Sequence, residues 1–245
     1  MSHRAGRWST ATARRGTWTA TGSDDAVGRM GRILLVCTGA VCRSPAAASL
    51  LRAALAGQAV TVRAVGTRAL AGAPMDPRTL AALPPGSPGA REHVAHQLVA
   101  ADVAGADLVL GLTTEHRAAA VLLVPAAVRR SFTLLELARL VGATHPAAPR
   151  LEDPDAMPGR LADLCARAVA ARPLAAGGPD DVPDPVAEPA AAHVETVARI
   201  AEAVRSIAAA LAVPPHGAEH LSRATRPDRR GIRDAQPLTR AGLHP

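Results

Sequence analysis

Strand-like apolar runs alternate with Ala- and Leu-rich helical segments along the middle of this chain, which predicts a single α/β domain with a four-stranded parallel sheet. The four runs span residues 33–36, 59–65, 106–112 and 130–133. A helical segment separates each run from the next, so right-handed crossovers should lay the strands parallel with helices on both faces, as in a doubly wound sheet. Such sheets bind ligands beyond the carboxyl ends of their strands.

The first strand leads into the most informative segment, which reads GRILLVCTGAVCRSPAAASLLRAAL over residues 31–55. A seven-residue turn from Cys37 to Arg43 follows the apolar run, and an Ala- and Leu-rich helix comes next. Ser44 as N-cap and Pro45 as the first helical residue would begin that helix. The order strand, loop, helix therefore places Cys37 and Arg43 at the two ends of one loop.

This loop has the features of an oxyanion site. Backbone N–H groups at a helix N-terminus converge on one point, and the helix dipole adds positive potential there. Arg43 can bind two phosphate oxygens bidentately, and the same field favours the thiolate form of Cys37. A thiolate beneath a phosphate monoester can attack phosphorus and form a cysteinyl-phosphate that water hydrolyses. The residues predicted to bind the phosphate are Thr38, Gly39, Ala40, Val41, Cys42, Arg43 and Ser44.

The other elements follow from local signals. Asp76 and Pro77 suit the N-cap and first position of a short helix, and Thr113 or Thr114 suits the cap of a later one. The helices expected after the first one span about residues 77–83, 91–103, 114–124, 134–141, 150–172 and 190–213.

Charge and composition divide the chain into three parts. The formal net charge is +7, but residues 1–30 hold five Arg against two Asp and residues 214–245 hold six Arg against three acids. The middle is nearly balanced, which argues against a nucleic-acid partner. We predict a disordered N-terminal extension at 1–29, the domain at 30–213 and a disordered basic tail at 214–245. Met30, directly before the first strand, is a candidate biological start.

The same data predict a compartment. No run approaches the 18 or more apolar residues of a membrane span, and the N-terminal segment has no apolar stretch typical of a secretory signal. The three Cys residues do not form a disulfide framework. We expect a cytoplasmic protein without a membrane partner.

The remaining Cys and His residues carry weaker signals. Cys42 lies in the same tight loop as Cys37 and either packs there or forms a reversible disulfide with it. Cys165 reads as structural. Four His residues show no metal-ligand spacing, so we assign them to the surface and expect no metal: His93, His96, His116 and His145.

The pattern V-C-x-G-x-x-C-R-S-P around Cys37 resembles the low-molecular-weight protein tyrosine phosphatases and the related arsenate reductases. The resemblance runs from about residue 32 to about residue 213, and its further matches are Gly66-Thr67-Arg68, residues 107–117 and Asp184-Pro185. It implies a doubly wound sheet of four parallel strands and an Asp-Pro loop that supplies an acid. It also implies that the hydroxyl of Ser44 hydrogen-bonds the nucleophilic sulfur.

A phosphatase of this type needs an acid to protonate the leaving oxygen. Asp184 lies just ahead of the last helix, where the family carries an Asp-Pro-Tyr acid loop, so we favour it over Asp153, while Asp181 could share the role. The chain departs from the family at two positions. Ala40 replaces an Asn that suits a positive φ, and Val186 replaces the Tyr after Asp-Pro.

The sequence thus predicts a phosphomonoester hydrolase of the protein-tyrosine-phosphatase type. Its catalytic residues would be Cys37, Arg43 and Asp184, and it would need no cofactor because Arg43 and the loop amides stabilise the charge. The partner would be a phosphorylated protein (phosphotyrosine) or a small phosphoester. Two alternatives stay open: a thiol-dependent arsenate reductase, and a catalytically weak phosphate-binding pseudophosphatase.

Overall fold

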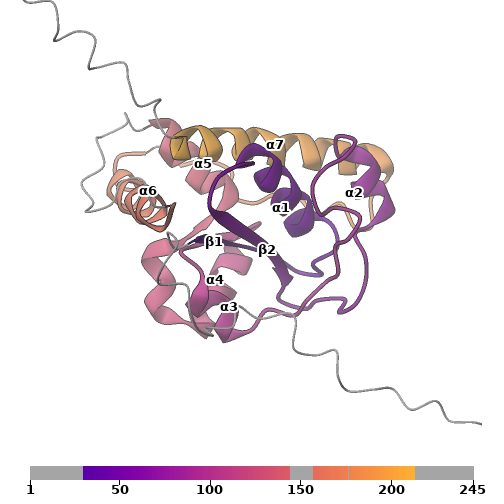
Figure 1. Cartoon of the computed structure of the whole chain (residues 1–245), viewed down its shortest axis with the longest axis horizontal. Coiled ribbons are helices and arrows are strands. Elements are labelled where there is room, and N and C mark those ends of the chain that lie inside the picture. The colour runs from indigo at the N-terminus through magenta and orange to yellow at the C-terminus, as the bar shows by residue number, and fades with distance from the viewer. Residues whose placement is uncertain (1–29, 144–156, 176, 213–245) are drawn as a thin grey trace, which may run out of the picture. The chain divides into compact units, whose positions relative to one another are not determined.

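A computed structural model of the chain describes residues 30–143, 157–175 and 177–212 (Figure 1). The predicted extensions at 1–29 and 214–245 lie outside these residues. The predicted domain boundaries stay predictions. Within the described residues, no helix has both the length and the apolar character that a bilayer crossing requires.

The sheet has the predicted four parallel strands. They lie in the order β2-β1-β3-β4, with the bounds β1 (Gly31–Cys37), β2 (Val60–Gly66), β3 (Leu108–Gly111) and β4 (Ser131–Thr133). In the register of β1, Cys37 lies opposite Gly66 of β2, and Val36 lies opposite Gly111 of β3. The carboxyl ends of three strands therefore meet beside Cys37.

Helices cover both faces of this sheet (Figure 1). They are α1 (Arg43–Ala54), α2 (Pro77–Ala82), α3 (Ala100–Gly105), α4 (Thr114–Leu123), the 3-10 helix η2 (Pro125–Arg130), α5 (Leu134–Ala143), α6 (Met157–Ala171) and α7 (Ala190–Leu211). Ile33 and Leu35 of β1 lie in the larger core with residues of α1, α5, α6 and α7. Leu34 and Val36 lie in a smaller core with residues of α3 and α4. This alternation explains why β1 reads as a continuous apolar run.

The long helix α7 packs against α1, α2 and α5 (Figure 1). Its apolar side chains recur at helical spacing, and Val197, Ile200, Val204 and Ile207 are buried. Because α1 begins at the Cys37–Arg43 loop, this packing brings the residues just before α7 close to the loop.

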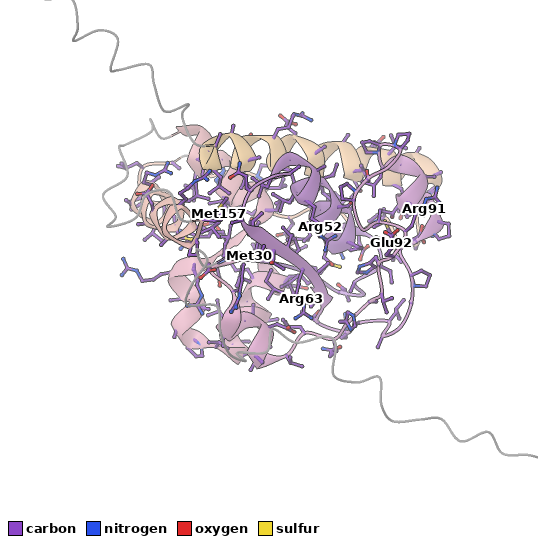
Figure 2. All side chains as sticks on the ribbon, in the orientation of Figure 1. Met30, Arg52, Arg63, Arg91, Glu92 and Met157 are labelled. Atoms are coloured by element: carbon purple, nitrogen blue, oxygen red, sulfur yellow. The ribbon has the colours of Figure 1, made fainter. Side chains whose placement is uncertain are left out.

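The prediction of helix over residues 91–103 is wrong for 91–99. There the backbone pairs with the end of β2: the Gly66 N–H donates to the His96 carbonyl (2.9 Å), and the Leu98 N–H donates to the Gly66 carbonyl (2.8 Å). These long-range hydrogen bonds replace helical ones, and only α3 remains of the predicted helix. Buried Asp102 of α3 pairs with Arg63 of β2, 2.9 Å from Nη1 to Oδ1 (Figure 2 labels Arg63).

Two other predictions on the elements have definite outcomes. Asp76 caps α2 as predicted, since its side chain accepts from the N–H groups of Arg78 and Thr79. The predicted helix over 150–172 is α6, which begins at Met157 (labelled in Figure 2), and residues 150–156 lie outside the described ranges.

Candidate active site

A cavity of about 260 Å³ opens at the carboxyl end of β1. The predicted site residues that line it are Cys37, Thr38, Gly39, Val41, Cys42, Arg43 and Asp184, and the loops around it add Arg68, Leu70 and Val186. The other two predicted residues, Ala40 and Ser44, are fully buried next to the lining residues. The fold therefore brings the predicted residues together from segments about 140 positions apart in the sequence.

The carbonyl oxygens of residues 37–42 all accept hydrogen bonds from groups outside the loop. In chain order the donors are Thr67 N (2.8 Å), Arg68 N (2.9 Å), Leu70 N (3.0 Å), His93 Nε2 (2.7 Å), Asp76 N (2.9 Å) and Ala46 N (3.2 Å). Because N–H and C=O point in opposite directions across a trans peptide, the amides of the loop turn toward its interior. In the described part of the chain, none of the amides of residues 38–42 donates a hydrogen bond to another protein group.

Arg43 completes this set of donors. Its side chain is 5% exposed, and its Nε–H has no partner among the described residues. A buried polar group without a partner is costly, so a bound oxyanion is a natural acceptor for the Arg43 Nε–H and the loop amides.

Ala40 has an unusual backbone conformation, and it lies at the position where the family pattern that the sequence resembles has Asn. Its φ is 57°, and within the described ranges it is the single non-glycine residue with positive φ. The imidazole of His93 donates from Nε2 to the Ala40 carbonyl. Burial lowers the pKa of His93, so its ring is neutral near pH 7 and keeps the Nε2 proton for this bond.

Ser44 is not the N-cap of α1, which corrects the prediction. The helix begins at Arg43, two residues before Pro45, and Cys42 at the cap position makes no side-chain cap hydrogen bond. The Ser44 hydroxyl instead lies 3.1 Å from the Cys37 sulfur and 3.2 Å from the Val65 carbonyl. While it donates to that carbonyl, its oxygen can accept from a Cys37 thiol. If it turns, it can donate to a Cys37 thiolate.

The segment that carries Asp184 is hydrogen-bonded to the carboxyl edge of the sheet and to Arg43. The Val182 N–H donates to the Leu112 carbonyl just beyond β3 (2.8 Å), and the Val182 carbonyl accepts from Arg43 Nη1 (3.1 Å). The Asp184 carboxylate forms a close ion pair with Arg43 Nη2. The Asp184 side chain is 42% exposed, so it can leave this pair without opening the core.

Of the two other candidate acids, the structure describes Asp181, which does not line the cavity. Asp181 accepts from the Thr114 N–H (2.7 Å) at the N-terminus of α4, where the helix dipole favours its negative charge. Asp153 lies outside the described residues. Asp184 is therefore the single one of the three that the described residues place in the cavity wall.

His116 is buried, although the sequence assigned it to the surface. Its Nε2 lies 2.9 Å from Thr38 Oγ1 and its Nδ1 lies 2.8 Å from Thr113 Oγ1. Arg43 Nη2 also donates to Thr38 Oγ1, at 3.4 Å. Thr38 can thus donate a hydrogen bond to Nε2 of a neutral His116, whose Nδ1–H donates to Thr113. Burial and the nearby Arg43 charge lower the pKa of His116 to about 4, consistent with this neutral tautomer.

Sequence reasoning missed His116 because a lone His in the first turn of a helix has no distinctive spacing. Its position was still informative, since α4 follows β3 and starts at the carboxyl edge of the sheet, where ligands bind. The rim residue Leu70, 57% exposed, had no local signal, whereas Val186, 46% exposed, was marked by its place directly after Asp184-Pro185.

A larger cavity, of about 690 Å³, lies elsewhere, between α3, η2 and α6. It contains Arg32 and Asp107 at the amino ends of β1 and β3, together with Cys165 of α6. Burial raises the pKa of Cys165 to about 12, so this thiol stays protonated and is a poor nucleophile. The smaller cavity beside Cys37 is the better candidate for catalysis.

Comparisons with known proteins agree with this site. The family model described as "Low molecular weight phosphotyrosine protein phosphatase" matches residues 32–157, about half of the chain. A probable low molecular weight protein-tyrosine-phosphatase, EpsP of Ralstonia solanacearum, is 45% identical over 78 residues, which are 32% of this chain and 52% of EpsP. The chain thus spans about half the length of the curated relatives it matches.

Solved structures of similar fold cover more of the chain. The YwlE arginine phosphatase from Geobacillus stearothermophilus has a TM-score of 0.54 and 25% identity, covering 74% of this chain and 92% of YwlE. Vibrio vulnificus Wzb in complex with benzylphosphonate has a TM-score of 0.51 and 22% identity, covering 74% of this chain and 98% of Wzb. With the family match over the loop that starts at Cys37, the four-stranded parallel sheet and these structural relatives, the chain belongs to the low molecular weight phosphotyrosine protein phosphatase family.

Proposed function

We propose that this protein hydrolyses phosphate monoesters through a cysteinyl-phosphate on Cys37, and that its substrates are proteins bearing phosphotyrosine. The observation that carries the proposal is the direction of the peptide groups in the loop from Cys37 to Arg43. Its carbonyls are bound on the outside, which leaves the amides of residues 38–42 and the Arg43 Nε–H for an oxyanion. These donors would stabilise the charge that develops on the phosphoryl oxygens in the transition state.

In the first step the Cys37 sulfur attacks phosphorus, and the bond from phosphorus to the ester oxygen breaks. The leaving oxygen takes the bonding electron pair and a proton from Asp184. In the second step water attacks phosphorus, Asp184 takes its proton, and the phosphorus–sulfur bond breaks. Ser44, 3.1 Å from the sulfur, donates a hydrogen bond to the departing thiolate.

Asp184 has to change partners during this cycle. Its carboxylate pairs with Arg43 Nη2, the group that a phosphate would also bind. We infer that a phosphoryl group displaces Asp184 from Arg43, and that the freed carboxylate takes up a proton from solvent and turns toward the leaving oxygen. Asp184→Asn should therefore retain phosphate binding while it slows turnover of esters with poor leaving groups.

An aromatic leaving group fits the mouth of the cavity. Leu70 and Val186 are both exposed there, and they present apolar surface that the ring of phosphotyrosine can cover. Arg68 at the same rim favours peptides with acidic residues beside the phosphotyrosine.

The decisive assay is steady-state hydrolysis of p-nitrophenyl phosphate without added metal, followed by matched peptides bearing phosphotyrosine, phosphoserine or phosphoarginine. Cys37→Ser should abolish turnover, and Cys165→Ser should leave it unchanged, since Cys165 lies in the other cavity. Hydrolysis that survives Cys37→Ser would refute the mechanism. A preference for the phosphoarginine peptide would agree with the mechanism through Cys37 but would contradict the proposal that phosphotyrosine is the substrate.

The arrangement of the thiols favours hydrolysis over a thiol-dependent arsenate reduction. The Cys165 sulfur contacts the Asp107 carbonyl, and the Asp107 N–H pairs with the Arg32 carbonyl. Cys37 is five residues further along β1, about 17 Å away at the rise of a strand. That distance is far beyond disulfide reach, so Cys42 alone could relay oxidation from Cys37. Arsenate-dependent consumption of thiols by the purified protein would support the arsenate reductase alternative instead. The hydrolytic mechanism needs a free Cys37, so we also propose a reducing compartment, the cytoplasm.

A further inference from the structure

A second group of metal-ligating side chains lies where three elements meet beside the loop. Cys42 ends the loop, Asp76 caps α2 and His193 lies in the first turn of α7. One potential ligand atom from each of them lies within 4.8 Å of those of the other two. We propose that Cys42, Asp76 and His193 bind a zinc ion, which would tie the phosphate loop to α2 and α7 and has no part in the hydrolytic reaction.

The geometry brings the three ligands together without rearranging the backbone. His193 Nδ1 lies 3.8 Å from Asp76 Oδ1, so the imidazole and the carboxylate lie within reach of one ion with bonds of about 2.1 Å. Cys42 is 3% exposed and His193 is fully buried, so the ligands are held in place by packing. Thr79 lies beside His193, with its hydroxyl 2.7 Å from His193 Nδ1.

Each ligand can offer a lone pair to a cation, and for His193 this requires the Thr79 hydroxyl to turn away from Nδ1. Asp76 Oδ1 accepts the N–H groups of Arg78 and Thr79 and the Nε–H of Arg78, but Oδ2 accepts from Arg78 Nη2 alone in the described residues. These bonds orient the carboxylate as outer-shell partners do in metal sites. The His193 Nε2 is buried and has no partner in that part of the chain, so the ring can hold its proton there and offer Nδ1 to the ion.

The chemistry of the set selects the ion. A thiolate and an imidazole disfavour Mg²⁺ and Ca²⁺, which take oxygen ligands. Cys, His and Asp together suit Zn²⁺, with a water in the fourth position. The positive charge of the Arg78 guanidinium beside Asp76 disfavours a nearby Zn²⁺. Cys42 loses its proton when it binds the ion, and the negative charge of the resulting thiolate offsets this repulsion.

The site can be tested apart from the active-site thiol. Because the Cys37 sulfur could itself bind a soft cation, the titrations use the full chain with Cys37→Ser. Co²⁺ serves as the spectroscopic substitute for Zn²⁺, since a thiolate bound to Co²⁺ gives a charge-transfer band. In this background Cys42 and Cys165 are the two remaining thiols, so the additional change Cys165→Ser tells which of them binds.

We expect the band to saturate at one Co²⁺ per chain, to persist in Cys165→Ser and to disappear on addition of Zn²⁺. His193→Gln keeps a hydrogen-bonding side chain, and Asp76→Asn keeps the α2 cap. Each should weaken Zn²⁺ binding by about tenfold or more, as even outer-shell changes do. The matched control His96→Gln, at an exposed His, should leave it unchanged.

Three results would overturn the site. They are no thiolate band in the Cys37→Ser background, a band lost with Cys165→Ser, or Zn²⁺ affinity unaltered by both His193→Gln and Asp76→Asn. In each case the cluster would act only as a hydrogen-bonded link between the loop, α2 and α7. Because Cys37 is absent from every titration, these results are independent of phosphatase activity.

Discussion

Replacing His116 with Gln should make the stability of this protein less sensitive to acid. Burial, helped by the charge of Arg43, lowers the pKa of His116 from 6.5 to about 4. Between these two values the unfolded chain binds a proton at this residue and the folded chain does not. Stability therefore falls as the pH falls through this window, and the full contribution is present above pH 6.5.

The magnitude follows from the size of the pKa change. At ~1.4 kcal/mol per unit, the complete loss is on the order of 3 kcal/mol. Most of this loss can be measured, since the free energy of unfolding should fall by about 2 kcal/mol between about pH 7 and about pH 5. The loss has a structural route, because a protonated His116 can no longer accept from Thr38, whose hydroxyl also accepts from Arg43.

The assay is urea unfolding of the wild-type chain and of His116→Gln at the two pH values. We expect the wild type to lose about 2 kcal/mol more than the variant. Taking the difference between the two proteins removes the contribution of other groups, including His93, whose pKa burial also lowers. Parallel losses, equal to within about 0.5 kcal/mol, would show that His116 titrates alike in both states and would refute the reasoning.

Three further substitutions test the loop and its supports. Gly66→Ala would place a methyl group 2.4 Å from the Thr38 carbonyl oxygen, so unfolding should show a loss of about 3 kcal/mol. Gly142→Ala, where no described residue would lie within 4 Å of the new methyl group, should instead stabilise the protein by about 0.5 kcal/mol through helix propensity. Equal effects of the two changes would contradict the close approach at Gly66. Ser44→Ala should slow breakdown of the cysteinyl-phosphate by about tenfold or more, seen as a burst of p-nitrophenol before a slower steady state; a slower rate without a burst would count against its role. Thr38→Val should lower kcat/KM by about five- to tenfold while Thr38→Ser restores it, and equal rates in all three proteins would mean that the link to Arg43 is not used.

The strands were predictable because the sheet is buried on both faces. Continuous burial of Leu34, Leu35 and Val36 requires a run of apolar residues, and such a run is visible without any partner. The loop was predictable for a similar local reason, since Cys37 and Arg43 lie on the two sides of a turn between a strand and a helix.

The two wrong predictions, the helix over residues 91–99 and the N-cap at Ser44, have a different cause. Residues 91–99 looked weakly helical, but their backbone pairs with Gly66, a partner about 30 positions away. Ser44 has the residue type of an N-cap, but the sulfur of Cys37 and the Val65 carbonyl compete for its hydroxyl. In each case a long-range hydrogen bond overrides the local preference, and no local pattern records such a bond.

The replacement of Asn by Ala at position 40 shows how far these long-range bonds determine the site. A positive φ costs a non-glycine residue about 1–2 kcal/mol, and Ala40 has no side-chain group to compensate for it. The hydrogen bond from His93 to its carbonyl contributes about 1 kcal/mol, and the neighbouring carbonyls are held by the amides of Leu70 and Asp76. The direction of the loop amides therefore depends on donors outside the loop rather than on the side chain at position 40. An oxyanion site can in this way keep its backbone geometry after losing a side chain that the family pattern contains.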